Sequence, residues 1–148
     1  MNVDKAKEIH DLLFIFMGLF HEKFLYRLRQ ENICDPFLKK NHTKILSILY
    51  QHDHITLTEI SKLLDIEKGS MTTLIDVLEE EDFVIRLNDP TDRRKTLISL
   101  SAKGREEMDR VMNLHAQKMD EFLVNSDSEE IQKFKTNLQF VVDFMKNV

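Results

Sequence analysis

Apolar residues recur every three to four positions in the first part of the chain, from Asp4 to Glu31. This spacing predicts a long helix with an apolar stripe. Further apolar residues, among them Phe14, Ile15 and Met17, fall on a second face of the same helix. A helix that is apolar on two faces usually packs between two partners, and in a chain this short the second partner can be another subunit.

Shorter apolar patterns follow, and they predict three more helices. We expect these helices over about 45–52, from Thr58 to Leu64, and from Ser70 to about Asp82, with a short extended stretch at Ile55-Thr56. Asp35-Pro36 is expected to open the first of them, as a cap followed by a first-turn proline. Thr58 is expected to cap the second, with Ile60, Leu63 and Leu64 as its buried face.

Two runs rich in aliphatic and β-branched residues come next, 83–87 and 96–100, on either side of a polar loop that contains Pro90. This pattern predicts a β-hairpin. Two long helices are then expected, one over 101–124 that Ser101 caps and one ending near Lys146. The segment from Ser126 to Glu129 has the spacing of a capping box for the last helix.

The stretch from Thr56 to Leu100 therefore runs helix, tight turn, helix, hairpin, which is the order of a winged helix-turn-helix. The second of its helices begins with Ser70, Thr72 and Thr73 on the face away from the core. Small hydroxyl side chains can bond base edges or phosphates. The predicted fold class is mostly α, with a small β-hairpin wing.

The strongest motif lies at this hairpin. Asp89-Pro90-Thr91-Asp92-Arg93-Arg94-Lys95, followed by Leu97-Ile98-Ser99-Leu100-Ser101-Ala102-Lys103-Gly104, resembles the wing of the MarR family of regulators. The family signature is an Asp, any residue, an Arg, five residues and then Leu-Thr. Asp92, Arg94 and Leu100 fit it, and Ser101 stands in place of the Thr.

This resemblance implies an intertwined helical homodimer whose winged lobes project toward DNA. A single MarR-like domain would cover residues 1–148, with a DNA-binding lobe at 38–100 and a helical dimerisation region at 1–37 and 101–148. Arg94 would enter the minor groove, where an arginine reads groove shape, and Asp92 would hold Arg94 or the wing backbone in place. The expected DNA-binding residues are Lys62, Lys68, Ser70, Thr72, Thr73, Asp92, Arg93 and Arg94.

The sequence also departs from the family. The family often has an Arg where Thr73 stands and another where Val77 stands, and Lys-Gly where Glu81-Asp82 stands. Asp82 is therefore expected to take the left-handed conformation of that Gly, which Asp tolerates better than most residues. The stretch 57–95 holds six basic and ten acidic residues, so we expect DNA binding of modest affinity or steep salt dependence.

Composition narrows the class of protein further. The 148-residue chain has a net charge of -5 and one cysteine, Cys34, which fits a cytoplasmic protein without an intrachain disulfide. The apolar run 12–20 is too short to span a bilayer, so no membrane partner is expected. Cys34 is either a redox sensor or an ordinary thiol. Cys34, His42 and His115 can converge in a fold, but none of them has a spaced His or Cys partner on its own helix, so we expect neither metal nor cofactor.

Two further questions stay open at this stage. The aromatic residues Phe14, Phe16, Phe20, Phe24, Tyr26 and Tyr50 either line a pocket for a small-molecule effector, whose identity the sequence does not give, or serve core and dimer packing. The acidic stretch 79–82 favours an alternative function, a winged-helix module that binds a protein and no DNA.

Taken together, the residues and the resemblance predict a sequence-specific transcription regulator. It would act as a repressor and bind double-stranded DNA at a pseudo-palindromic operator as a homodimer. No nucleophile elbow, phosphate loop or paired-histidine motif is present in the sequence, so an enzyme is not expected.

Overall fold

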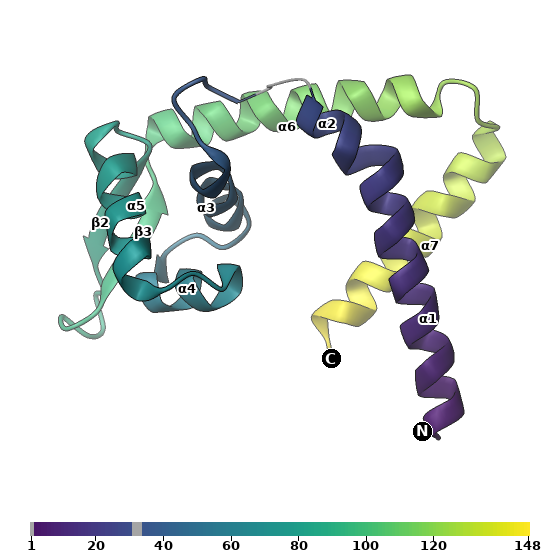
Figure 1. The fold of residues 1–148 in the computed structure, drawn as a ribbon, viewed down its shortest axis with the longest axis horizontal. Coiled ribbons are helices and arrows are strands. Elements are labelled where there is room, and N and C mark those ends of the chain that lie inside the picture. Colours follow the sequence, from purple (N-terminus) through teal and green to yellow (C-terminus); the bar gives the residue numbers. More distant parts are fainter. Residues whose placement is uncertain (1, 31–33) are drawn as a thin grey trace. The chain divides into compact units, whose positions relative to one another are not determined.

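A computed structural model describes residues 2–30 and 34–148, which are mostly helical with one small sheet. The elements, drawn in Figure 1, are α1 (Val3–Phe20), the π-helical turn η1 (His21–Leu25), α2 (Tyr26–Gln30), α3 (Lys40–Gln51), β1 (Ile55–Thr56), α4 (Leu57–Leu64), α5 (Lys68–Glu80), β2 (Val84–Asn88), β3 (Thr96–Leu100), α6 (Ala102–Leu123) and α7 (Ser128–Lys146). This composition confirms the predicted fold class. The chain forms two compact units, Met1–Leu114 and His115–Val148.

The predicted first helix is present, but it is not regular. A five-residue π-helical turn separates α1 from α2, and the expected end at Glu31 lies outside the described residues. All of α1 is exposed to solvent in the single chain. Among the described helices, none is long and apolar enough to cross a membrane.

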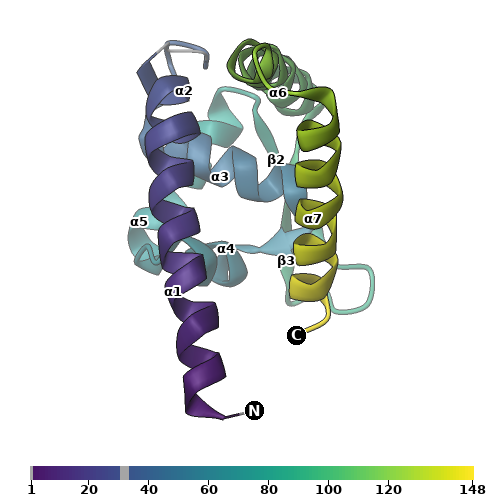
Figure 2. The same ribbon diagram turned by 90° about the vertical axis from the view of Figure 1, so that its right-hand side faces the viewer.

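The winged lobe consists of α3, α4, α5 and a three-stranded antiparallel sheet of order β1-β3-β2. In the hairpin, Val84 pairs with Leu100 and Asn88 pairs with Thr96, while Ile55 of β1 pairs with Ile98 on the other edge of β3. The loop between β2 and β3 extends away from the three helices in both views (Figures 1 and 2). The predicted hairpin is thus confirmed, and β1 adds a third strand to it.

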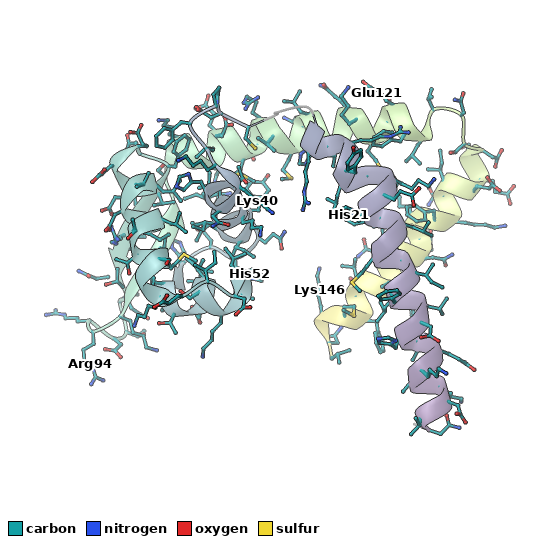
Figure 3. The ribbon with its side chains drawn as sticks, viewed as in Figure 1. His21, Lys40, His52, Arg94, Glu121 and Lys146 are labelled. Carbon is teal, nitrogen blue, oxygen red and sulfur yellow. The ribbon has the colours of Figure 1, made fainter. Side chains whose placement is uncertain are left out.

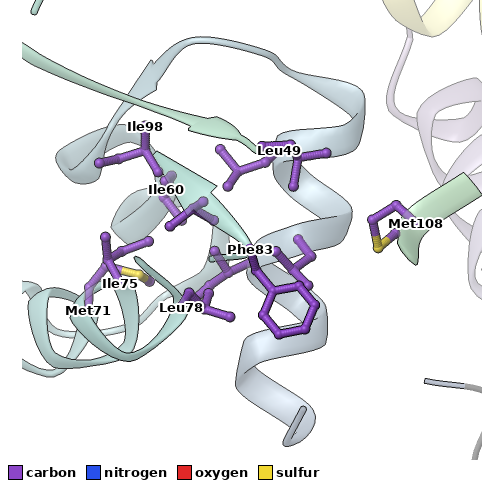
Figure 4. Close-up of a cluster of buried hydrophobic side chains, with 12 residues drawn as sticks. Leu49, Ile60, Met71, Ile75, Leu78, Phe83, Ile98 and Met108 are labelled. Atoms are coloured by element: carbon purple, nitrogen blue, oxygen red, sulfur yellow. The ribbon is translucent and has the colours of Figure 1, made fainter. Parts of the chain in front are cut away.

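Apolar side chains from α3, α4, α5, β2 and β3 meet in one core (Figure 4), and the partly buried Ile55 of β1 packs against it. Leu49 of α3, Ile60 of α4, Ile75 of α5 and Ile98 of β3 are fully or almost fully buried. Met108 of α6 completes this core, so the first turns of α6 pack against the lobe. The proposed boundary of the DNA-binding lobe at residue 100 stays a prediction. Met108, which lies after this boundary, contributes to the core of the lobe.

The expected caps of α3 and α4 are both wrong. Asp35-Pro36 does not open α3. Instead, Asp35 Oδ1 accepts the Phe37 N–H at 2.9 Å and closes a turn, and α3 begins at Lys40. Thr56, not Thr58, caps α4: its Oγ1 accepts the Glu59 N–H, while Glu59 Oε2 accepts the Thr56 N–H at 2.7 Å. This reciprocal pair is a capping box.

The turn of the helix-turn-helix also differs from the expectation. Asp65 takes the left-handed conformation and ends α4, and α5 then begins at Lys68, two residues before Ser70. Leu63 is 55 % exposed, so its expected place in the core is wrong.

The second unit, residues 115–148, contains the end of α6 and all of α7. Asp127 caps α7 by accepting the N–H groups of Glu129 and Glu130, so the expected cap at Ser126 is one residue too early. No residue of α7 is buried in the single chain. Apolar side chains such as Phe140 and Phe144 remain exposed on it.

One tight corner joins α5, the hairpin and α6. Asp82 has a φ of 69°, which confirms its predicted left-handed conformation. Ser101 Oγ donates to the carbonyl of Asp82 and accepts the Gly104 N–H, and the Ser101 N–H donates to the carbonyl of Phe83. A Cβ at Gly104 would lie 2.0 Å from that Phe83 oxygen. Glycine is required at this position because a backbone atom occupies the space of a side chain.

This corner predicts that Gly104→Ala lowers the free energy of unfolding by about 3 kcal/mol, since the backbone must shift to admit the methyl group. Gly69→Ala is the matched control, because that helical glycine has no atom within 4 Å of an added Cβ. The control should raise stability by roughly 0.5–1 kcal/mol. Denaturant unfolding of both variants tests this, and equal effects would contradict it.

Candidate nucleic-acid interface

The wing loop is folded by its own side chains. Asp89 Oδ1 accepts hydrogen bonds from the Thr91 N–H at 2.8 Å and from the Thr91 hydroxyl at 2.7 Å, and these bonds lower the pKa of Asp89. The Asp89 N–H in turn donates to the Lys95 carbonyl across the base of the loop. Sequence reasoning missed this role of Asp89, although Asp-Pro-Thr is a typical turn-forming pattern.

The structure brings Asp92 and Arg94 together at the tip of this loop. Asp92 Oδ1 accepts the Arg94 backbone N–H at 3.0 Å and the Arg94 Nε–H at 3.2 Å. The Arg94 side chain is nevertheless 91 % exposed. Figure 3 shows it at the outer end of the hairpin, directed away from the helices of the lobe. Asp92 thus fixes the Arg94 backbone and the Nε edge of its guanidinium, while the side chain as a whole stays exposed and can reach a ligand.

The first turns of α5 present the hydroxyl residues. Ser70, Thr72 and Thr73 are exposed, as expected. Thr72 Oγ1 donates to the Lys68 carbonyl at 3.0 Å, and Thr73 Oγ1 donates to the Gly69 carbonyl at 3.4 Å. Because each hydroxyl proton is used within the helix, the oxygen lone pairs are left to bond a ligand. These two side chains are therefore arranged to accept hydrogen bonds, for example from the amino groups of adenine or cytosine.

The remaining predicted residues supply positive charge. Lys62 lies on α4, Lys68 is the first residue of α5, and Arg93 lies in the wing loop; all three are exposed. Lys62 and Lys95 also lie close enough to Glu59 to lower its pKa, although the hydrogen bonds from Thr56 contribute more. The lobe therefore offers cations on α4, α5 and the wing.

Arg86 is another basic residue of this lobe, and sequence reasoning gave it no role. It lies on β2, and its guanidinium binds two carboxylates of α5, with Nη2 at 2.5 Å from Asp76 Oδ1 and Nη1 at 2.7 Å from Glu79 Oε1. Asp76 and Glu79 are three residues apart, so they lie on the same face of α5. This ion pair occupies part of the acidic stretch that favoured a protein-binding function.

Cys34 and His42 are both withdrawn from solvent, and burial shifts the pKa of each. Burial and the nearby Glu107 raise the pKa of the Cys34 thiol, while Arg110 opposes them, so the reactive thiolate is disfavoured. His42 is buried, which lowers its pKa, and its Nδ1 accepts the Lys39 N–H. Within residues 2–30 and 34–148, no three His, Cys, Asp or Glu side chains are grouped as metal ligands.

Comparison with protein families gives a match to the MarR family over residues 38–96. The chain is 31 % identical to the HTH-type transcriptional regulator MhqR of Bacillus subtilis over 88 residues, which are 60 % of this chain and 61 % of that protein. It is 28 % identical to the HTH-type transcriptional repressor YetL of the same organism over 81 % of this chain and 74 % of YetL. The chain thus spans about three fifths of the length of MhqR.

Solved structures share the fold. A MarR family protein from Bacillus stearothermophilus has a TM-score of 0.71 at 22 % identity, with 99 % of both chains covered. Streptococcus pneumoniae FabT, solved in complex with DNA, has a TM-score of 0.59 at 20 % identity, again with 99 % of both chains covered. At these identities the likeness establishes the fold.

The wing geometry predicts that Asp92→Ala weakens binding to duplex DNA, although it removes a negative charge. Without Asp92, the backbone and side chain of Arg94 lose the acceptor that holds them. Arg94→Ala should cost roughly 1–3 kcal/mol, the scale of a good groove contact, and Arg93→Ala should cost less. Fluorescence anisotropy with a duplex that the wild-type protein selects from a random pool measures these losses.

Asp92→Asn is the control, because the amide oxygen can still accept the Arg94 N–H while the ion pair is lost. Its affinity should fall between those of the wild type and Asp92→Ala. Tighter binding by Asp92→Ala with Arg94 intact would refute the orienting role.

Proposed function

This chain belongs to the MarR family, and we propose that it is a sequence-specific DNA-binding transcription regulator. It binds a pseudo-palindromic operator as a homodimer and acts as a repressor. The observation that carries the proposal is the geometry of the wing loop. Arg94 projects from the tip of the hairpin, and Asp92 accepts hydrogen bonds from its backbone N–H and its Nε–H. The match to YetL, which is named a repressor, supports the direction of regulation.

The division of roles follows from the chemistry of the exposed groups. Thr72 and Thr73 point acceptor oxygens outward from the start of α5, where they choose among base edges. Lys62 and Lys68 carry point charges suited to phosphate, which position the lobe without reading sequence.

The homodimer is supported by apolar surface that the single chain leaves uncovered. On α1, Leu12 is 67 % exposed and Phe16 is 45 % exposed; on α7, Phe140 is 72 % exposed and Phe144 is 62 % exposed. Phe16 and Phe20 stack at 5.9 Å along the exposed surface of α1. Exposed apolar surface on a helix marks an interaction site, and a second copy of the chain is the partner that the family fold provides. Two lobes would then reach successive major grooves about 34–36 Å apart.

A winged-helix module that binds protein is the alternative, and the acidic residues Glu80 and Glu81 at the end of α5 favour it. The two functions differ in their response to salt. A DNA-binding lobe releases counterions from the phosphates, so its affinity for DNA falls steeply as salt rises. A protein-binding module without a DNA site binds no duplex at any salt concentration.

We predict that Lys62→Ala/Lys68→Ala and Thr72→Val/Thr73→Val behave differently in a salt titration. The lysine pair should weaken operator and random DNA alike and reduce the slope of log K against log salt by about two. The threonine pair should reduce the ratio of operator to random affinity and leave the slope unchanged. Valine keeps the methyl group and the shape of threonine, so this pair isolates the hydroxyls. The same profile for both double variants would show that the roles are wrongly assigned.

We predict a stable dimer at micromolar concentration in analytical ultracentrifugation. Phe16→Glu should shift the protein toward monomer, because it places a charge on the exposed apolar face of α1. Lys7→Glu, a change of charge at an exposed position of the same helix, should leave the sedimentation coefficient unchanged. A wild-type protein that sediments as a monomer would contradict the homodimer.

A further inference from the structure

We propose that Arg86 is a positioning residue that locks α5 to the wing, so that the two DNA-reading elements keep one fixed geometry. This inference rests on the proposed function and adds to it a residue that reaches the DNA only through α5. The evidence is the contact of one guanidinium with two carboxylates of α5.

The geometry suits a lock because it has two attachment points. Arg86 reaches Asp76 with one terminal nitrogen and Glu79 with the other. The guanidinium is planar and rigid, so both distances are fixed by a single group. One contact would still allow α5 to rotate about its axis, whereas two contacts on adjacent turns fix both its rotation and its position along the axis.

The base of the lock is itself rigid. Arg86 lies in the middle of β2 and pairs with Ile98, which is fully buried in the core. Its side chain is 28 % exposed, less than the side chains of Asp76 and Glu79 at 52 % and 42 %. Solvent therefore screens this pair less than it screens a pair of fully exposed side chains.

The lock acts on the face of α5 that presents the threonines. Asp76 lies four residues after Thr72 and three after Thr73, and Glu79 lies seven after Thr72, so all four fall on one side of the helix. A rotation of α5 that broke either contact would move both threonines. Arg86 thus connects the orientation of the base-reading residues to the strand that carries the wing.

Variants that neutralise the carboxylates bound by Arg86 distinguish a positioning role from a general effect of charge on DNA affinity. D76N/E79Q replaces the two charge-assisted hydrogen bonds of Arg86 by weaker neutral ones. It also deletes two negative charges near DNA, so the loss of Coulomb repulsion alone predicts tighter binding to every sequence. If Arg86 positions α5, random DNA binds more tightly while the ratio of operator to random affinity falls about tenfold, the cost of one misplaced base contact. The control E80Q/E81Q deletes two charges from the same helix end without touching Arg86. It should raise both affinities and preserve the ratio.

R86K provides a second test, because lysine keeps the charge but cannot bind two carboxylates with one rigid fork. The operator-to-random ratio of R86K should fall as in D76N/E79Q. An unchanged ratio in R86K, or equal ratios in D76N/E79Q and E80Q/E81Q, would overturn the proposal. The probe is a duplex selected by the wild-type protein from a random pool, compared with a scrambled duplex of equal length.

Hydrogen exchange decides the same question without DNA. Backbone amides of α5 around residues 76–80 and of β2 should exchange faster in D76N/E79Q than in the wild type, and at the wild-type rate in E80Q/E81Q. R86A deletes both contacts outright, and unchanged exchange in both D76N/E79Q and R86A would show that no lock exists. A wild-type protein that binds no duplex would instead refute the proposed function, and the exchange result would still stand.

Discussion

The winged lobe depends on the close approach of two backbone segments, where Gly104 in the first turn of α6 meets the carbonyl of Phe83. Ser101 ties the same place together, since its hydroxyl bonds the Asp82 carbonyl and the Gly104 N–H. The end of α5, the start of β2 and the start of α6 therefore share one junction. Together with the Arg86 ion pairs, this junction sets where the wing stands relative to α5, and the proposed DNA contacts depend on that relation.

Several acidic residues of this lobe have structural roles. These roles account for part of the excess of acidic over basic residues in the lobe. Glu59 completes a capping box, Asp65 ends α4 in a left-handed conformation, and Asp89 folds the wing loop. These carboxylates serve the backbone and the local turns. The charges that the proposed function requires are concentrated instead in a few exposed basic side chains at the wing tip, at the end of α4 and at the start of α5.

Much of this architecture could be predicted from the sequence, because it follows from local rules. The hairpin follows from two β-rich runs around Pro90, and the left-handed Asp82 follows from the glycine usual at that position in the family. Leu63 was misplaced because helical periodicity shows which residues share a face and not whether a partner covers it. The Arg86 contacts were missed because they depend on the angle between a helix and a strand, which no spacing along the chain reveals.

The charge balance of the lobe has a consequence for how such a protein would find its target in a cell. With ten acidic residues against six basic ones in 57–95, and Arg86 already engaged, few cations remain to hold the protein on arbitrary chromosomal DNA. Weak nonspecific binding shortens the time that the protein slides along DNA in each encounter. It also prevents the millions of nonspecific sites in a genome from sequestering the protein. A small number of copies could then keep an operator occupied, and occupancy would respond quickly when the protein's abundance or conformation changes.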